Sequence, residues 1–231
     1  MLIGQEGIEI LASSTVSVFG LGGVGSFTVE ALVRAGLGSL VLTDFDTVSP
    51  SNLNRQLHAM EDTVGMSKVD LMTERIRRIN SRVDVTGYRC RYTPEDRDRF
   101  FAVRPDYVVD AIDDVDGKVD LIKYCLMEGI PVVSSMGAGN KMDPALFRLD
   151  DISKTSVCPL AREVRRRLRK EGITSGLKVV FSTEQPCTPK RNNDVRPEKV
   201  VPASISFVPP VAGMILAGAV VRDLISWGGS V

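Results

Sequence analysis

A glycine-rich turn between a predicted strand and a predicted helix constrains this chain more than any other feature. Residues 20–25, Gly20-Leu21-Gly22-Gly23-Val24-Gly25, fit the pattern G-x-G-x-x-G. The alternating stretch 15–19 before the turn predicts a strand, and residues 26–35, which end at Gly36, predict a helix. Glycines let the backbone turn tightly and approach phosphate oxygens, which then meet free N–H groups at the helix start. The pattern predicts a nucleotide site that includes Gly20, Gly22, Gly23 and Gly25. A turn that only packs helix on strand is the alternative.

Strand and helix patterns alternate along the first 143 residues. Further strands are predicted at 40–43, 83–88, 107–109 and 131–133, and further helices at 69–79, 94–101 (capped by Thr93) and 118–128. The strands are largely continuous apolar runs, which is typical of a parallel sheet covered on both faces. Because crossovers between parallel strands are right-handed, we expect an α/β fold with a doubly wound, mainly parallel, Rossmann-like sheet.

The rhythm of the sequence changes after about residue 143. An arginine-rich helix is predicted at 158–171, a strand at 178–181 and an apolar helix at 211–225. The stretch 183–202 contains four prolines and mixed charges, so we expect a mobile loop there. We therefore expect a single domain over residues 1–231, with a nucleotide-binding part up to about 143 and a smaller distal lobe over about 144–231.

Composition narrows the class of protein. The chain has 29 basic and 29 acidic residues, which argues against a uniformly basic nucleic-acid binder but leaves room for a local patch. Its four cysteines form no CxxC pair, so no zinc site is indicated and reduced cytoplasmic thiols are expected. No signal peptide is visible, and the longest apolar run, 207–221, contains two prolines and is short for a membrane span. We expect a soluble, cytoplasmic protein with no membrane partner.

Polar and charged residues follow the second predicted strand. Asp44 comes 19 residues after Gly25, where a carboxylate can accept hydrogen bonds from ribose hydroxyls. A dehydrogenase needs only that acid, whereas phosphoryl or nucleotidyl transfer also needs cations against the polyphosphate and a carboxylate for magnesium. Arg55 and Lys68 can supply the cations, and Asp113, at the end of another strand, can face the same crevice. Arg55 or Lys68 alone is equally well explained as a surface residue, but together with Asp113 they favour an ATP site over a dinucleotide site.

These segments resemble the ThiF/MoeB/HesA superfamily, the adenylating relatives of ubiquitin-activating enzymes. The resemblance rests on G-L-G-G-V-G, D-F-D-T-V-S-P-S-N-L-N-R-Q, G-M-S-K and D-A-I-D, and it spans about residues 4–139. It implies an enzyme that activates a carboxylate: the substrate carboxylate attacks the α-phosphate of ATP, giving an acyl-adenylate and pyrophosphate. It also implies roles for individual residues: phosphate contacts from Gly22, Gly23, Asn52, Arg55 and Lys68, a ribose contact from Asp44, support from Asp46 and Gln56, and Asp113 on Mg²⁺ or the adenylate. Arg55, Lys68 and Asp113 are the catalytic candidates.

The distal half is similar to one branch of this superfamily, whose members dehydrate threonylcarbamoyladenosine in tRNA. Segments 134–144, 158–161 and 179–184 carry this likeness, which covers nearly the whole chain. The branch uses ATP to activate the carboxylate of a threonylcarbamoyl group on a tRNA adenosine beside the anticodon. Attack from within the same modification then closes a ring, with net loss of water. MoeB- and ThiF-type members usually bind zinc through two CxxC pairs, which this sequence lacks.

The arginine-rich helix is the candidate for nucleic-acid binding. Residues 162–170 contain six basic side chains and one acid, Glu163. Such a patch on a neutral protein suits contacts with tRNA phosphates, although a solvated helix face is an equally good interpretation. The candidate contacts are Arg162, Arg165, Arg166, Arg169 and Lys170, to which Lys190, Arg191, Arg196 and Lys199 of the expected loop could add.

Several expectations come from the resemblance or stay open. A homodimer and a sulfur-transfer protein are expected partners, and residues 136–140 could wrap a monovalent cation, although a plain loop is the better interpretation. We expect His58 to be structural and Cys187 to be an incidental thiol. Three alternatives to the dehydratase remain: adenylation of a sulfur-carrier protein C-terminus, an NAD-dependent oxidoreductase, and a scaffold without catalysis. The scaffold is considered because adenylating relatives often carry an N-terminal arginine, whereas the first arginine here is Arg34.

Overall fold

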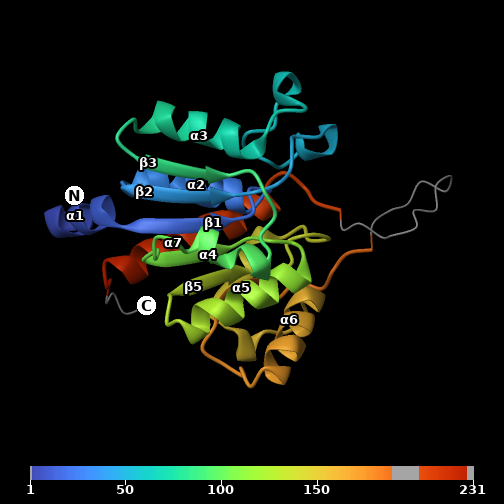
Figure 1. Ribbon diagram of the computed structural model, residues 1–231. Coiled ribbons are helices and arrows are strands. Elements are labelled where there is room, and N and C mark those ends of the chain that lie inside the picture. The colour runs from blue at the N-terminus through green and yellow to red at the C-terminus, as the bar shows by residue number, and fades with distance from the viewer. Residues whose placement is uncertain (1, 189–202, 228–231) are drawn as a thin grey trace.

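A seven-stranded sheet with helices on both faces forms the body of the protein (Figure 1). The computed structural model describes residues 2–188 and 203–227. The strands are β1 (Thr15–Phe19), β2 (Ser39–Thr43), β3 (Asp84–Tyr88), β4 (Tyr107–Asp110), β5 (Val132–Ser135), β6 (Phe147–Asp151) and β7 (Lys178–Ser182). The α-helices are α1 (Gly4–Ser13), α2 (Gly25–Ala35), α3 (Lys68–Ile79), α4 (Arg97–Phe100), α5 (Val115–Met127), α6 (Pro159–Lys170) and α7 (Val208–Leu224).

The strand order is β3-β2-β1-β4-β5-β7-β6, and among the strands of the described residues only β6 runs antiparallel to its neighbour. The chain moves outward from β1 to β2 and β3 on one side, then crosses back to β4 and moves outward to β5. At the end of β1, Phe19 is paired with Thr43 of β2 on one side and Asp110 of β4 on the other. The carboxyl ends of these strands therefore meet at the point where the strand order reverses, which is where open α/β sheets bind ligands. The predicted doubly wound fold is confirmed.

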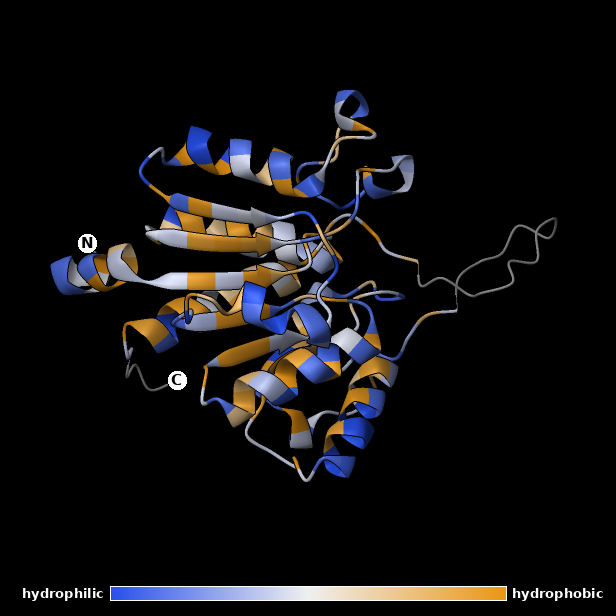
Figure 2. Ribbon diagram, viewed as in Figure 1, coloured by the Kyte–Doolittle hydropathy of each residue, from blue (hydrophilic) through white to orange (hydrophobic). Residues whose placement is uncertain are grey.

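Two hydrophobic cores lie on the two faces of the sheet. One is formed with residues of α2, α3 and α7, and the other with residues of α4, α5 and α6. In β4, Tyr107 and Val109 belong to the first core and Val108 to the second, because successive side chains point to opposite faces. This explains why the strand is apolar at every position. Figure 2 shows the helices with apolar residues toward the sheet and hydrophilic residues outward.

Most of the predicted elements are present, with shifts at their ends. Helix α5 begins at Val115 because the Asp114 side chain accepts a 2.9 Å hydrogen bond from the Gly117 N–H and caps it. Helix α7 begins at Val208, before the predicted start, because Pro209 and Pro210 fall in its first turn, where a helix needs no N–H donor. The predicted helix 94–101 is a 3₁₀ turn (Pro94–Asp96) followed by α4, and the Thr93 side chain makes no capping hydrogen bond there, contrary to prediction.

Helix α1 and strand β6 were not predicted. Strand β6, with the sequence Phe-Arg-Leu-Asp-Asp, is an edge strand, and edge strands tolerate the charges that disguise it. Helix α1 contains two glycines and has no side-chain cap, so it lacks the usual start signals. Strands β6 and β7 extend the same sheet as the nucleotide-binding part, and the proposed boundary near residue 143 stays a prediction.

The expected loop over residues 183–202 is described only up to residue 188. Residues 189–202, with Lys190, Arg191, Arg196 and Lys199, lie outside the described residues. Among the helices of 2–188 and 203–227, none is long and apolar enough to cross a membrane.

Candidate active site

A cavity of about 700 Å³ lies at the carboxyl ends of β1, β2, β4 and β5. It brings together residues that are far apart in the sequence. Ten of the predicted site residues line it: Gly20, Gly22, Gly23, Asp44, Asp46, Asn52, Arg55, Gln56, Lys68 and Asp113. Gly25 does not line it. The topological switch point and the predicted nucleotide site therefore coincide.

The glycine turn is required by close backbone contacts. Gly20 has a φ of +91°, and a Cβ there would lie 2.6 Å from the carbonyl oxygen of Ala111. A Cβ on Gly25 would lie 1.8 Å from the carbonyl oxygen of Gly20. Gly25 therefore lets the start of α2 close against the turn, whereas Gly22 and Gly23 present their backbone to the cavity.

The Asp44 carboxylate is fixed at the end of β2. Its Oδ2 accepts a 2.6 Å hydrogen bond from the Leu21 N–H of the glycine turn, and its Oδ1 accepts one of 2.8 Å from the Asp46 N–H. Burial raises the pKa of Asp44 above its ordinary value, although the Lys68 charge and these two N–H groups act in the opposite direction. Both oxygens keep lone pairs for ribose hydroxyls, as the predicted role requires.

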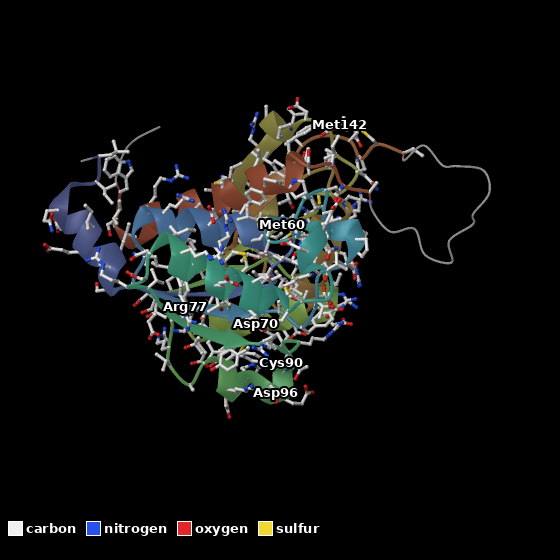
Figure 3. All side chains as sticks on the ribbon, turned by 90° about the horizontal axis from the view of Figure 1, so that it is seen from above. Met60, Asp70, Arg77, Cys90, Asp96 and Met142 are labelled. Carbon is white, nitrogen blue, oxygen red and sulfur yellow. The ribbon has the colours of Figure 1, made fainter. Side chains whose placement is uncertain are left out.

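Lys68 is the buried cation on this side of the cavity. Its side chain is almost fully buried, and Nζ lies 2.7 Å from Asp46 Oδ2. Lys68 opens helix α3, where the Ser67 side chain caps the helix by accepting from the Asp70 N–H. Figure 3 views α3 from outside, with Asp70 and Arg77 labelled along it. Asp46 thus holds the Lys68 ammonium in an ion pair, and its supporting role toward a nucleotide stays a prediction.

The asparagine–arginine motif forms the rim of the cavity. Asn52 Oδ1 accepts from the Ser49 N–H at 3.1 Å, which leaves its amide nitrogen as the donor for a ligand. Arg55 donates to the Ser51 carbonyl oxygen and to Asn54 Oδ1. Gln56 is buried, and its Oε1 has no hydrogen-bond partner among the described residues. All three side chains line the cavity, and their contact with a phosphate chain stays a prediction.

Two neighbouring acids after β4 have different tasks. Asp114 is the N-cap of α5, whereas Asp113 is exposed at the cavity wall and makes no ion pair within residues 2–188 and 203–227. The same part of the chain contains no cluster of three or more metal-ligating side chains. Of the two acids, Asp113 is the one whose carboxylate could hold Mg²⁺. Proteins commonly bind this ion through one or two carboxylates together with substrate phosphates.

A buried ionic network beneath the cavity floor was not predicted. Lys118 Nζ lies 2.6 Å from Asp110 Oδ2 and donates to the Ser135 carbonyl oxygen at 3.0 Å and to Ser134 Oγ at 3.3 Å. Asp110 Oδ1 accepts from the Ile112 N–H. The network ties the loop that carries Asp113 to the end of β5. One signal was available: Lys118 lies three and four positions before Leu121 and Ile122, on the buried face of α5.

The cavity extends beyond the nucleotide residues to a second end, which we call the distal end. It is lined by the loop after β5, by the start of α6 and by the segments around Pro186 and Ser204; its residues are Ser135–Lys141, Cys158–Leu160, Pro186, Ser204 and Pro209. Asn140, with a φ of +57°, joins three of these segments. Its N–H donates to the Ala203 carbonyl oxygen, its Oδ1 accepts from the Ala203 N–H, and its carbonyl oxygen accepts from the Cys187 N–H.

Helix α6 presents part of the predicted basic patch. Arg162, Arg166, Arg169 and Lys170 are exposed. The expectation that Arg165 is available outside is wrong, because it is half-buried and donates to the carbonyl oxygen and hydroxyl of Thr155. The Arg166 guanidinium forms an ion pair with the Glu163 carboxylate, which also pairs with Arg167. The single acid of the helix therefore neutralises part of the patch, and Arg162, Arg169 and Lys170 carry the rest.

His58 and Cys187, whose roles the sequence does not determine, lie outside the cavity lining. His58 is buried, and neither ring nitrogen has a hydrogen-bond partner within the described residues. Burial lowers its pKa to about 4, with a smaller effect from the Lys68 charge. Cys187 is exposed, and its sulfur lies 3.8 Å from Glu184 Oε1; within residues 2–188 and 203–227 no basic side chain is bonded to it. The structural reading of His58 and the incidental reading of Cys187 both stay predictions.

Comparison with known proteins places this geometry among its relatives. Residues 1–229 match the ThiF family. The chain is 49% identical to tRNA threonylcarbamoyladenosine dehydratase of Bacillus subtilis over 97% of this chain and 92% of that protein. It is 40% identical to the Escherichia coli protein of the same name over 84% and 75%. Molybdopterin-synthase adenylyltransferase of Salmonella typhimurium is 36% identical over 60% of this chain and 54% of that protein.

Solved structures agree with the sequence relatives. The crystal structure of E. coli tRNA N6-threonylcarbamoyladenosine dehydratase in complex with ATP superposes with a TM-score of 0.88 and 35% identity, covering 97% of this chain and 91% of that one. The complex of the same protein with AMP gives a TM-score of 0.89. The glycine turn, the acid after β2 and the asparagine–arginine rim thus lie in a fold that binds adenine nucleotides in a relative. From its sequence and its fold, this chain belongs to the ThiF family.

Proposed function

We propose that the protein uses ATP to adenylate the carboxylate of threonylcarbamoyladenosine in tRNA and thereby drives loss of water from that modification. The observation that carries the proposal is one cavity that joins a nucleotide end, with Asp44, Lys68 and the glycine turn, to a distal end at the start of a basic helix. Relatives named for this dehydration, similar over nearly the whole chain, support it.

The proposed reaction has two steps. A carboxylate oxygen of the substrate attacks the α-phosphorus of ATP, pyrophosphate leaves, and an acyl-adenylate forms. A nucleophilic atom of the same threonylcarbamoyl group then attacks the acyl carbon, loses its proton and expels AMP. The oxygen removed from the substrate ends in AMP, so ATP hydrolysis to AMP and pyrophosphate accounts for the lost water.

The residues of the nucleotide end divide the work. Asp44 orients the ribose, and the backbone of Gly22 and Gly23 approaches the phosphates. Lys68 and Arg55 offset the charge that develops on the α-phosphate and the leaving pyrophosphate. Asn52 and Gln56 donate hydrogen bonds at the rim.

Asp113 would hold Mg²⁺ together with phosphate oxygens, and the metal would neutralise phosphate charge. The exposed, unpaired position of Asp113 within the described residues fits this role. The monovalent cation near residues 136–140, the homodimer and the sulfur-transfer partner stay predictions, as does the cytoplasmic location.

Helix α6 would contact tRNA phosphates. It begins at the distal end of the cavity and carries Arg162, Arg169 and Lys170 on its surface. Such contacts give affinity that falls with salt and carries little sequence information.

ATP turnover with tRNA that carries threonylcarbamoyladenosine, followed by mass spectrometry of the nucleosides, tests the proposal. We expect AMP and pyrophosphate release only with the modified tRNA, and a nucleoside lighter by one water. AMP formation only with a sulfur-carrier protein would instead support the MoeB-type reaction. Binding of NAD without ATP turnover would support the oxidoreductase, and nucleotide binding without any turnover would leave a scaffold.

A further inference from the structure

The distal end of the cavity contains one charged side chain that the nucleotide does not use. Lys141 lies in the loop between β5 and β6, lines the cavity and is only 4% exposed. The other residues of the distal end are neutral.

The Lys141 ammonium has no direct carboxylate partner within residues 2–188 and 203–227. It donates a hydrogen bond to the carbonyl oxygen of Glu184. The Glu184 carboxylate is occupied, because it accepts from the N–H groups of Met142 and Asp143. Burial acts to raise the pKa of Glu184, but these N–H groups and the Lys141 charge lower it overall. The Lys141 ammonium therefore has a carbonyl oxygen as its hydrogen-bond acceptor and the Glu184 carboxylate only as a nearby charge, so it keeps two donors for an anion.

The start of helix α6 adds to the positive potential of the distal end. Cys158, Pro159 and Leu160 line the cavity, and the helix has no side-chain cap. The N-terminus of a helix carries partial positive charge and unpaired N–H groups, both of which favour a negative group nearby. Two independent features of the structure therefore favour an anion at the same end of the cavity.

The cations of the nucleotide end have other partners. Lys68 pairs with Asp46, and Arg55 is bonded to Ser51 and Asn54 at the rim. Arg91, which also lines the nucleotide end, stacks its guanidinium over the Phe45 ring at 4.3 Å. Within the described part of the chain, Lys141 is thus the charged side chain best placed for an anionic group of the second substrate.

We propose that the Lys141 ammonium binds the carboxylate of the threonylcarbamoyl group and holds it toward the α-phosphate of ATP. This inference rests on the function proposed above and names the residue that recognises the substrate there. An unmodified adenosine has no carboxylate, so Lys141 distinguishes modified from unmodified tRNA. The loop that carries it is fixed on both sides, by Asn140 to Ala203 and Cys187 and by Met142 to Glu184.

The test compares binding of one tRNA with and without threonylcarbamoyladenosine, in the presence of a non-hydrolysable ATP analogue. Lys141→Met removes the charge, and Lys141→Gln also removes it but keeps an amide donor for the Glu184 carbonyl oxygen. We expect both variants to lose about tenfold to a hundredfold of the preference for modified tRNA, the usual contribution of a hydrogen bond to a charged group. Lys141→Arg should keep part of the preference. Lys154→Met, which removes an exposed lysine paired with Asp150, is the matched control and should leave it intact.

Two further readouts separate this role from a structural one. Affinity for AMP should stay within about twofold of the wild type in the Gln variant, and the slope of tRNA binding against salt should not change, because Lys141 contacts no backbone phosphate. A Gln variant that still prefers modified tRNA as strongly as the wild type would overturn the role of Lys141 and leave the proposed function standing. A wild type that binds both tRNAs equally with the analogue, and that forms no dehydrated nucleoside when ATP replaces the analogue, would overturn both.

Discussion

The Lys118 ammonium lies 2.6 Å from Asp110 Oδ2, and neither side chain has any exposed surface. The pair links the end of β4 to the first turn of α5, directly beneath the loop that carries Asp113. Ser134 Oγ, 2.5 Å from Asp110 Oδ2, and the Ser135 carbonyl oxygen complete the network. A charge pair this deep in the protein costs much desolvation, so its geometry must be well satisfied to persist.

Removing one member of this pair should therefore be far worse than removing both. Lys118→Met leaves the Asp110 charge buried without a cation, and we expect a loss of about 3–5 kcal/mol in the free energy of unfolding. The double variant Lys118→Met/Asp110→Asn should recover most of it. Urea unfolding of the three proteins measures the difference, and a single variant within about 1 kcal/mol of the wild type would show that the pair is not needed.

Asp113 and Asp114 provide a matched pair of substitutions. Asp113→Ala should lower ATP turnover by about a hundredfold or more, because it removes a charge that acts on the reacting phosphates, and should leave the thermal midpoint unchanged. Asp114→Ala removes the cap of α5, so it should cost about 1 kcal/mol of stability but keep turnover. If Asp113→Ala turns over ATP normally, Asp113 does not hold the metal or the adenylate.

A substitution at Gly25 tests the glycine turn, and the same substitution at Gly36 is its control. Gly25→Ala should abolish nucleotide binding, because its Cβ would overlap the carbonyl oxygen of Gly20 and push the turn apart. Gly36 has a φ of +98° but open space around it. Gly36→Ala should therefore cost about 1 kcal/mol of stability without affecting nucleotide affinity. Calorimetric titration with AMP, alongside thermal unfolding, distinguishes the two effects.

The basic face of α6 predicts a change in salt dependence. Replacing Arg162, Arg169 and Lys170 by Gln should weaken tRNA binding and lower the slope of log K against log[salt] by about 1 for each lost phosphate contact. Arg165→Gln is the control: its bonds to Thr155 are structural, so it should reduce stability by about 1 kcal/mol and leave the slope alone. An unchanged slope in the triple variant would return the helix to a solvated surface.

His58 should make the protein less stable in mild acid. Its pKa is about 4 in the folded protein and 6.5 in the unfolded chain, so between these values the unfolded chain binds a proton that the folded protein does not. Stability is therefore full above pH 6.5 and falls as the pH drops toward 4, by at most about 3 kcal/mol from this residue. His58→Leu should flatten that part of the profile. The comparison is the difference between wild type and variant in urea unfolding from pH 7 to pH 4, which cancels the carboxylates common to both.

The fold and the nucleotide end of the site were predictable because local patterns determine them. Continuous apolar strands, a glycine turn and polar residues after successive strands are all properties of short segments, and a parallel sheet brings the ends of those segments together. Strand β6 was not predicted because an edge strand needs little apolar surface. Helix α1 was not predicted because its glycines are typical of a loop.

The rest of the site depends on side-chain pairing across the fold. Sequence placed Arg165 among the exposed arginines, since helical spacing does not show that Thr155 lies within its reach. Lys118 looked like the start of a helix, since its partners Asp110 and Ser134 lie on strands that only the sheet brings together. Lys141 stood in a loop whose burial comes from segments more than forty residues further along the chain.

The length of helix α6 bears on the tRNA contacts proposed for it. It starts at the cavity wall with Pro159 and ends at Lys170. Twelve residues at about 1.5 Å each span about 18 Å, or about five steps of a stacked strand at about 3.4 Å per nucleotide. A base whose modification sits in the cavity would then meet Arg169 and Lys170 only through phosphates some five nucleotides away. With the contacts proposed above, the helix would set a minimum length of RNA that can reach both the cavity and the far end of α6.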